Sequence, residues 1–221
     1  MDHVPAILSR VKVGERVIYR GQPDASWNLK PSIGRHYTGK WEVVADRERQ
    51  ALKEFKRRSV PYVREKPTSD IEWLCLMQHH GCSTRLLDFT SNPLIALFFA
   101  SEQLEAKDGR LIMATYTQSY PDALGEDLFA HKHAFAYHPP HITERIIGQS
   151  GCFVFCGEPN QHLNERNCES INIPAQYKPA IRAELKALGI SNSTLFPGAD
   201  GICQDINEAL IYDLAFEEIP F

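Results

Sequence analysis

Hydrophobic and polar residues alternate along a short segment near the N-terminus, and this pattern predicts a β-strand. Val17 and Tyr19 fall on one side of the segment, Ile18 and Arg20 fall on the other, and Gly21 marks its end. Three later runs are rich in β-branched, aromatic and other apolar residues. We expect buried strands there, at residues 110–117, 151–156 and 170–173.

Helical periodicity and capping residues predict the helices. Ser69 or Thr68 can cap a helix that begins at Asp70. Asn92 followed by Pro93 is typical of a helix start, and this helix should run to about residue 106. Further helices are predicted over residues 41–58, from Pro179 to Gly189 and over residues 201–212, whereas residues 118–149 lack a period and predict a long loop.

The order of these elements indicates the fold class. Strands and helices are mixed without strict strand–helix–strand alternation, which favours an α+β fold with a mainly antiparallel or split sheet flanked by helices. A chain of 221 residues has room for about one domain. No repeat or Pro/Ser/Gly-rich linker divides it, so we expect a single domain over residues 1–221.

Composition narrows the function classes. The 24 Lys and Arg against 28 Asp and Glu leave a net charge of −4, which argues against a surface that coats nucleic acid or anionic lipid, although a local basic groove stays open. The longest strongly apolar run, residues 94–100, is far shorter than the roughly 20 residues of a membrane span. Six cysteines without a signal-peptide pattern favour a reducing compartment, so we expect a cytoplasmic protein with no membrane partner.

A dense polar stretch, residues 78–93, lies between two predicted helices. It holds His79, His80, Arg85 and Asp88 together with several hydroxyl groups. Such a connection either satisfies its own backbone, with Arg85 paired to Asp88, or faces a ligand. Both interpretations stay open from the residues alone.

Arg20 and Gly21, at the end of the first predicted strand, form a second candidate site. A guanidinium group can donate two parallel hydrogen bonds to a phosphate. A glycine beside it can let a ligand approach the backbone closely. A surface salt bridge is the alternative explanation of the arginine.

Histidines and cysteines in the second half match metal sites only loosely. Four histidines fall within residues 131–141, and Cys152, Cys156, His162 and Cys168 miss the usual C-x2-C spacing, so no metal is expected. Trp27, which follows a turn, is a candidate for a pocket wall, with the core as the alternative.

The polar motifs together resemble the FRG domain family, whose Phe-Arg-Gly reads Tyr19-Arg20-Gly21 in this chain. The resemblance continues in Gln78-His-His-Gly81, Thr84-Arg-Leu-Leu-Asp88, Thr90-x-Asn-Pro93, Ala96-Leu-x-Phe-Ala100 and Gln149-x-Gly151-x-Phe153. It implies core motifs over about residues 11–156 and a C-terminal extension over residues 157–221.

More loosely, the chain is similar to the ADP-ribosyltransferase fold. This resemblance implies that Arg20 and Gly21 hold the phosphates of NAD, that Ser83 and Thr84 shape the nicotinamide pocket and that His80 orients a ribose hydroxyl. His79 and Arg85 complete the expected nucleotide-binding set. The third motif of that fold usually supplies a Glu, but Gln149 stands there, and Glu144 or Glu158 could substitute.

The implied function is recognition of NAD as a substrate, with transfer of ADP-ribose to a protein or nucleic-acid acceptor or cleavage of NAD. His80, Gln149 and Glu144 are the catalytic candidates. Two alternatives stay open: phosphoryl transfer on RNA or a nucleotide by His and Arg, and a non-catalytic nucleotide-sensing module. A toxin or defence role would fit by association only, and the acceptor does not follow from the sequence.

Overall fold

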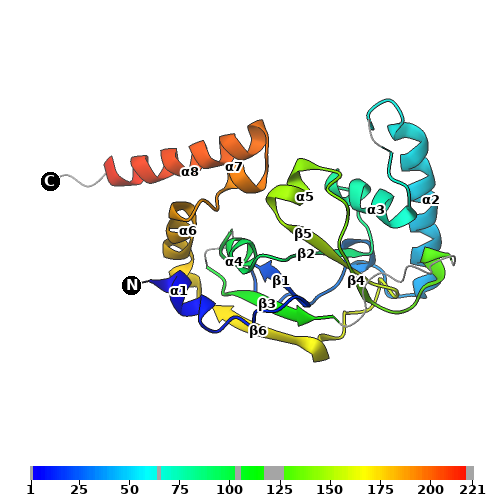
Figure 1. Ribbon diagram of the computed structural model, residues 1–221, viewed down its shortest axis with the longest axis horizontal. Helices are drawn as coiled ribbons and strands as arrows, with labels where there is room; N and C mark the ends of the chain where they lie inside the picture. The colour runs from blue at the N-terminus through cyan, green and yellow to red at the C-terminus, as the bar shows by residue number, and fades with distance from the viewer. Residues whose placement is uncertain (1, 64–65, 103–105, 117–126, 218–221) are drawn as a thin grey trace.

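The computed structural model describes residues 2–63, 66–102, 106–116 and 127–217, and its centre is one six-stranded sheet (Figure 1). The strand order is β4-β5-β2-β1-β3-β6, and every neighbouring pair is antiparallel. The predicted α+β class with an antiparallel sheet flanked by helices is confirmed. The strands are β1 (Val17–Gln22), β2 (Leu86–Thr90), β3 (Gly109–Thr115), β4 (Phe135–Tyr137), β5 (Gly151–Phe155) and β6 (Cys168–Ile173).

Helices flank the sheet, and α8 extends beyond it (Figure 1). The α-helices are α1 (His3–Leu8), α2 (Trp41–Ser59), α3 (Asp70–His79), α4 (Pro93–Ser101), α5 (Glu144–Gly148), α6 (Lys178–Ala187), α7 (Asn192–Leu195) and α8 (Ala199–Glu217). Short 3-10 turns are η1 (Ser32–Gly34), η2 (Leu128–Ala130), η3 (Glu165–Asn167) and η4 (Ala175–Tyr177).

The helices form two separate hydrophobic clusters on one face of the sheet. Over β2, β4 and β5, α2 and α3 pack a cluster that includes Leu74 and Phe153. Over β1, β3 and β6, α4 and α6 pack a second cluster that includes Leu97 and Leu111. The other face of the sheet carries a third cluster, to which Leu29 contributes from outside the strands.

The two halves of the sheet meet at a weak boundary between β1 and β2. Among the described residues these strands share one pair, Tyr19 with Thr90. By contrast, β1 forms six pairs with β3, and β2 forms five with β5. Beyond the shared pair β1 and β2 diverge, and we call this boundary the seam.

Local sequence signals predicted the starts of α3 and α4 and the end of α6, but α4 ends at Ser101, with an extended backbone at Glu102, and does not run to about residue 106. The Ser69 side chain accepts a hydrogen bond from the Glu72 amide and caps α3. The Asn92 side chain accepts one from the Leu94 amide, at 2.9 Å, and Pro93 is the first residue of α4. Gly189 follows α6 with a φ of 82°, the left-handed conformation expected of a helix end.

One prediction about the chain's centre was wrong. Residues 78–93 do not only connect two helices, because Leu86–Thr90 forms the central strand β2. Four of its five residues are buried, which leaves little alternation to detect in the sequence. The predicted loop over residues 118–149 also contains β4 and α5, and its residues 118–126 lie outside the described part of the chain.

Gly21 serves the packing of α4 on β1. A Cβ atom built at Gly21 would lie 1.9 Å from the carbonyl oxygen of Ala96 and 2.5 Å from the amide nitrogen of Ala100. Only a residue without a side chain therefore fits there. The space that we expected to admit a ligand to the Gly21 backbone is filled by the helix.

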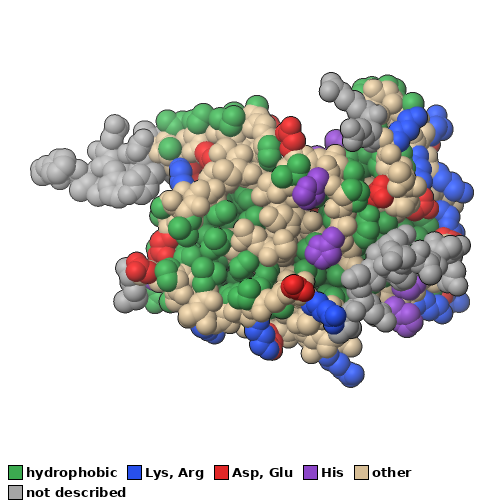
Figure 2. Space-filling view, in the orientation of Figure 1, with side chains coloured by type: hydrophobic (Ala, Val, Ile, Leu, Met, Phe, Trp, Pro, Cys, Tyr) green, Lys and Arg blue, Asp and Glu red, His purple; other side chains and the backbone are tan. Residues whose placement is uncertain are grey.

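α8 leaves the body of the molecule and packs chiefly on α7 (Figure 1). Ile202, Ile206 and Leu210 lie one helical turn apart and are about half exposed. Figure 2 shows hydrophobic side chains along this helix. None of the helices in the described part of the chain combines the length and apolar character needed to cross a bilayer.

Candidate functional site

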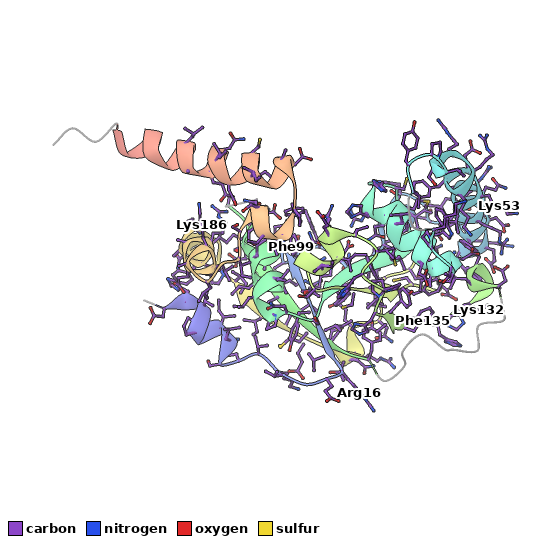
Figure 3. The ribbon with its side chains drawn as sticks, turned by 45° about the horizontal axis from the view of Figure 1, so that its top comes forward. Arg16, Lys53, Phe99, Lys132, Phe135 and Lys186 are labelled. Atoms are coloured by element: carbon purple, nitrogen blue, oxygen red, sulfur yellow. The ribbon has the colours of Figure 1, made fainter. Side chains whose placement is uncertain are left out.

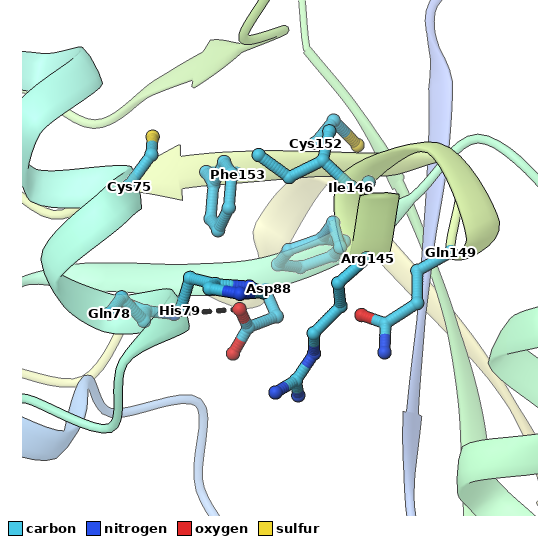
Figure 4. Close-up of a pocket in the computed structure, with 11 residues that line it drawn as sticks. Cys75, Gln78, His79, Asp88, Arg145, Ile146, Gln149, Cys152 and Phe153 are labelled. Atoms are coloured by element: carbon cyan, nitrogen blue, oxygen red, sulfur yellow. Dashed lines mark hydrogen bonds between the residues drawn. The ribbon is translucent and has the colours of Figure 1, made fainter. Parts of the chain in front are cut away.

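A cleft opens over the seam, between the two helical clusters. It consists of two adjoining hollows that share Asp88, Phe89, Arg145 and Gln149. The first hollow also contacts α3 and β5, and Figure 4 shows Asp88 at its centre with β1 crossing the direction of β2 and β5. The second hollow contacts β1 and the end of α4. The cleft therefore spans both halves of the sheet.

Asp88 is the central acidic group of the cleft. It lies in the middle of β2, and its side chain is 68% exposed although β2 is a central strand. The Gln78 amide of α3 donates a hydrogen bond to Asp88 Oδ1 at 2.7 Å (dashed line in Figure 4). This contact fixes one carboxylate oxygen and leaves the other turned toward the cleft.

The orientation of Gln78 is fixed in turn by a buried hydroxyl group. Thr84 Oγ1 donates a hydrogen bond to Gln78 Oε1 and accepts one from the Leu86 amide at 3.1 Å. Because Oε1 accepts, Nε2 is the atom left to donate to Asp88. Thr84 therefore supports the cleft from behind, as a fully buried residue, and does not line either hollow.

Arg20 lies in the seam. Its Nη1 donates a hydrogen bond to the carbonyl oxygen of Asp88 and lies 3.9 Å from the Asp88 carboxylate. The guanidinium thus bridges β1 and β2 where the strands diverge. Its side chain is only 16% exposed, and Nε is buried without a hydrogen-bond partner. Burial lowers the pKa of Arg20, with Asp88 opposing this effect, but an arginine stays charged at neutral pH.

Arg145 of α5 and Gln149, the residue that follows α5, form another wall of the cleft. Arg145 lines both hollows, and its guanidinium lies 4.9 Å from the centre of the Phe196 ring. Phe196 packs edge-on against Phe99 of α4, which is labelled in Figure 3. Gln149 Nε2 donates a hydrogen bond to the Leu195 carbonyl oxygen at 3.1 Å. Contacts with the α7 region therefore hold both side chains in place.

Of the two adjacent histidines, His79 faces the cleft. It lines the first hollow, whereas His80 is exposed at the end of α3 and lines neither. Burial, His80 and Arg145 all lower the pKa of His79 below its usual value of 6.5. His79 is therefore mainly neutral at pH 7, and an imidazole in that state can accept a proton.

Three further predicted site residues lie outside the two hollows. Ser83 and Glu144 are exposed and line neither hollow. Glu158 lines a different depression of the surface. The structure thus brings together Arg20, Gly21, His79 and Gln149 of the predicted set, and it places His80, Ser83 and Glu144 apart from them.

Arg85 is a structural residue, and its predicted pairing with Asp88 was wrong. Arg85 and Glu48 of α2 are both fully buried, and Glu48 accepts hydrogen bonds from the Arg85 amide and from Nε. The guanidinium also lies 5.1 Å from the ring centres of Phe129 and Phe155. These contacts enclose Arg85 on the side of the α2 cluster, where it lines neither hollow.

Arg145 and Glu102 line the cleft but were not predicted to do so. Glu102 follows α4 and lines the second hollow. Arg145 lies in a segment without clear periodicity, and only its distance of four residues from Gln149 pointed toward the site. Across the described ranges, no three His, Cys, Asp or Glu side chains gather as metal ligands.

Comparison with protein-family models matches residues 15–109 to the FRG domain. No curated protein matches the chain, and no solved structure matches it. The matched segment begins just before β1 and ends at Gly109, the first residue of β3. It supplies Arg20, His79, Asp88 and Glu102 to the cleft, whereas Arg145 and Gln149 lie beyond it. The chain therefore contains an FRG domain at residues 15–109.

Proposed function

We propose that the cleft over the seam binds NAD, with the diphosphate held by Arg20. The observation that carries this proposal is Arg20, which lines the second hollow and whose buried Nε lacks a hydrogen-bond partner. A buried donor without a partner is costly, and a phosphate oxygen would satisfy it with a charge-assisted hydrogen bond. Arg145 supplies a second positive charge to the same cleft.

Asp88 supports a reaction at the ribose. When the bond between C1′ and the nicotinamide nitrogen breaks, nicotinamide leaves with the electron pair and C1′ becomes oxocarbenium-like. A nearby carboxylate stabilises that positive carbon. Asp88 is an exposed carboxylate shared by the two hollows, so it takes the role for which the sequence suggested Gln149, Glu144 or Glu158. The acceptor of ADP-ribose is then a macromolecule or water.

The cysteines support a reducing, cytoplasmic setting for this reaction. All six are free, and Cys152 and Cys156 are buried with pKa values raised to about 12 by burial. Neither thiol is ionised at neutral pH, which keeps both unreactive.

A second candidate function is phosphoryl transfer on a nucleotide or RNA. One observation favours it: the neutral His79 shares a hollow with Arg145. An imidazole could remove a proton from the attacking hydroxyl while the guanidinium stabilises charge on the phosphate. In this reaction His79 rather than Asp88 would be essential.

Calorimetric titration of the purified chain with NAD, ADP-ribose and ATP tests the proposal, followed by an assay for released nicotinamide. Arg20→Gln keeps a donor for the Asp88 carbonyl but removes the charge, so NAD binding should be lost. Asp88→Asn keeps the acceptor for Gln78, so NAD should still bind while nicotinamide release falls about 100-fold or more, as on loss of one transition-state contact. Asp46→Asn, on the surface of α2, is the matched control and should change neither quantity.

The outcomes separate the two candidate functions. NAD binding that is indifferent to Arg20→Gln would refute the diphosphate site. If NAD does not bind while a short RNA is cleaved, and His79→Gln abolishes the cleavage, the phosphoryl-transfer function replaces the proposed one.

A further inference from the structure

A second depression lies along the side of the sheet away from the α2 and α4 clusters. One part of it is lined by Trp27, Lys30, Arg35 and His162. An adjoining part is lined by Lys132, by Glu158 and again by His162. We call Trp27, Lys30, Arg35, Lys132 and His162 the basic groove. It shares no lining residue with the cleft over the seam.

The backbone beneath the basic groove is tied together by long-range contacts. The Leu163 amide donates a hydrogen bond to the Leu29 carbonyl oxygen at 2.8 Å. The Asn160 side chain donates one to the Gly39 carbonyl oxygen. At Gly34 a Cβ atom would lie 1.8 Å from the Pro159 carbonyl oxygen, so the two segments pack backbone to backbone. The groove is therefore built by two chain segments that are far apart in sequence.

The cations of the groove lack acidic partners. Within the described residues, no carboxylate lies within 4.0 Å of the charged groups of Lys30, Arg35 or Lys132. The neighbouring Arg110 differs, since it pairs with Glu165 at 3.1 Å. Three cations without carboxylate partners outnumber Glu158 in the lining, so the groove is locally positive in a chain whose net charge is −4.

An aromatic ring completes the chemistry of the groove. Trp27 is 48% exposed, although the carbonyl oxygen of this residue is fixed by a hydrogen bond from Arg110 at 2.7 Å. A half-exposed indole on a fixed backbone offers a flat surface on which a planar group can stack. The sequence had left Trp27 between core and pocket wall, and the structure places it at a pocket.

We propose that the basic groove binds single-stranded nucleic acid, with one base stacked on Trp27 and phosphates paired with Lys30, Arg35 and Lys132. Unpaired cations that follow a groove, combined with an exposed aromatic ring, are the features by which proteins bind single strands without reading sequence. The two parts of the groove join at His162 and carry separate cations, which suits a chain of phosphates better than a mononucleotide. An acidic peptide could match the charges, but it has no base to stack on the indole.

Fluorescence anisotropy with labelled dT12 and rU12 oligonucleotides tests this inference on the full chain. Trp27→Ala should weaken binding about 5- to 150-fold, the effect expected for loss of one stacked base. Trp27→Phe should keep part of the affinity, and an unchanged thermal midpoint would show that both variants fold. The double variant Lys30→Gln/Arg35→Gln should lower the slope of log K against log salt by about 1.4, the loss of two phosphate contacts.

A charge-matched control is available on α2. Lys53→Gln/Arg57→Gln removes the same charge from an exposed helix surface and should leave the affinity unchanged. Equal weakening by both double variants, no effect of Trp27→Ala, or equal binding of poly-glutamate would overturn the inference. NAD titration of the same variants distinguishes the two sites. The groove variants should bind NAD normally, and Arg20→Gln should still bind the oligonucleotides.

Discussion

Arg20 and Arg85 show how two buried arginines of one motif set acquire different roles. Arg85 is enclosed with Glu48 and two phenylalanine rings, so its charge is paired inside the protein. Each arginine has one buried nitrogen without a hydrogen-bond partner, Nη2 in Arg85 and Nε in Arg20. Arg20 differs because it lines an open cleft and the carboxylate near it, Asp88, is exposed. The sequence could not separate them, because Glu48 lies 37 residues away from Arg85 on a helix whose pattern predicted only a general amphipathic character.

Arg85→Ala should destabilise the fold by about 3–5 kcal/mol, since it leaves the Glu48 carboxylate buried without its partner. Burial already raises the pKa of Glu48 while Arg85 opposes that rise. In the variant the folded-state pKa of Glu48 should rise further, so the loss of stability should grow as pH increases from about 4, the unfolded value. Urea unfolding at pH 5 and pH 8 measures both effects.

Arg57→Ala is the control for this experiment, because Arg57 is an exposed arginine that pairs with Glu54 on the same helix. It should leave the unfolding midpoint unchanged. An Arg85→Ala protein of normal stability that no longer binds NAD would restore Arg85 to the nucleotide-binding set.

At the scale of single elements, capping residues determine where the helices begin and end, and a glycine such as Gly21 allows a helix to pack closely on a strand. The caps of α3 and α4 and the end of α6 follow from side chains next to each other in sequence, which is why they could be predicted. The strand β2 could not be predicted in this way, because its exposed Asp88 belongs to a cleft whose other walls come from α3 and α5. A polar residue at a functional site interrupts the pattern that identifies a strand.

Gly21→Ala should cost about 3 kcal/mol, the upper end of the range for overpacking a core. The new methyl group would meet the backbone of α4, which cannot rotate away as a side chain could. Chemical unfolding measures the loss. Gly81→Ala offers a contrast, since Gly81 has a φ of 85° with nothing within 4 Å of a Cβ atom, so any destabilisation there comes from backbone strain alone. Equal stability of Gly21→Ala and the parent chain would contradict the close packing of α4.

The attachment of α8 should depend on pH through Asp205. Burial opposes ionisation of this carboxyl group, but hydrogen bonds from Ser193, Ser191 and Asn192 outweigh burial and lower its pKa to about 2. A lowered pKa in the folded state means that the stabilising effect is complete above the unfolded value near 4 and is lost as pH falls toward 2. The protection factors of the α7–α8 segment against hydrogen exchange, which correct for the intrinsic pH dependence of the exchange rate, should therefore fall over that interval.

Asp205→Asn should remove this pH dependence and show faster exchange already at pH 7. Asp200→Asn, at the start of the same helix, is the matched control. Unchanged protection of α8 in Asp205→Asn would mean that the carboxylate does not hold the two helices together.

On the scale of the whole molecule, the cleft arises from segments that meet only after the sheet has formed. Arg20, Asp88 and Arg145 come from the beginning, middle and later part of the chain. Sequence motifs therefore indicated Arg20, His79 and Gln149 as candidates but could not place His80 and Ser83 outside the cleft. The motifs also did not predict that β1 and β2 share only one residue pair at the seam in the described part of the chain. Strand pairing depends on which strands are neighbours, and one sequence does not reveal this.

The end of the family match at Gly109 bears on how short a working chain can be. β1 takes six pairs from β3, which begins at that residue, and only one from β2. A chain cut at Gly109 would leave β1 as a nearly bare sheet edge, with Tyr19 and Leu97 uncovered where β3 and α6 had packed. Such an edge invites pairing between chains. The smallest fragment able to remain monomeric should therefore extend through β6 and α6, to at least Ala187.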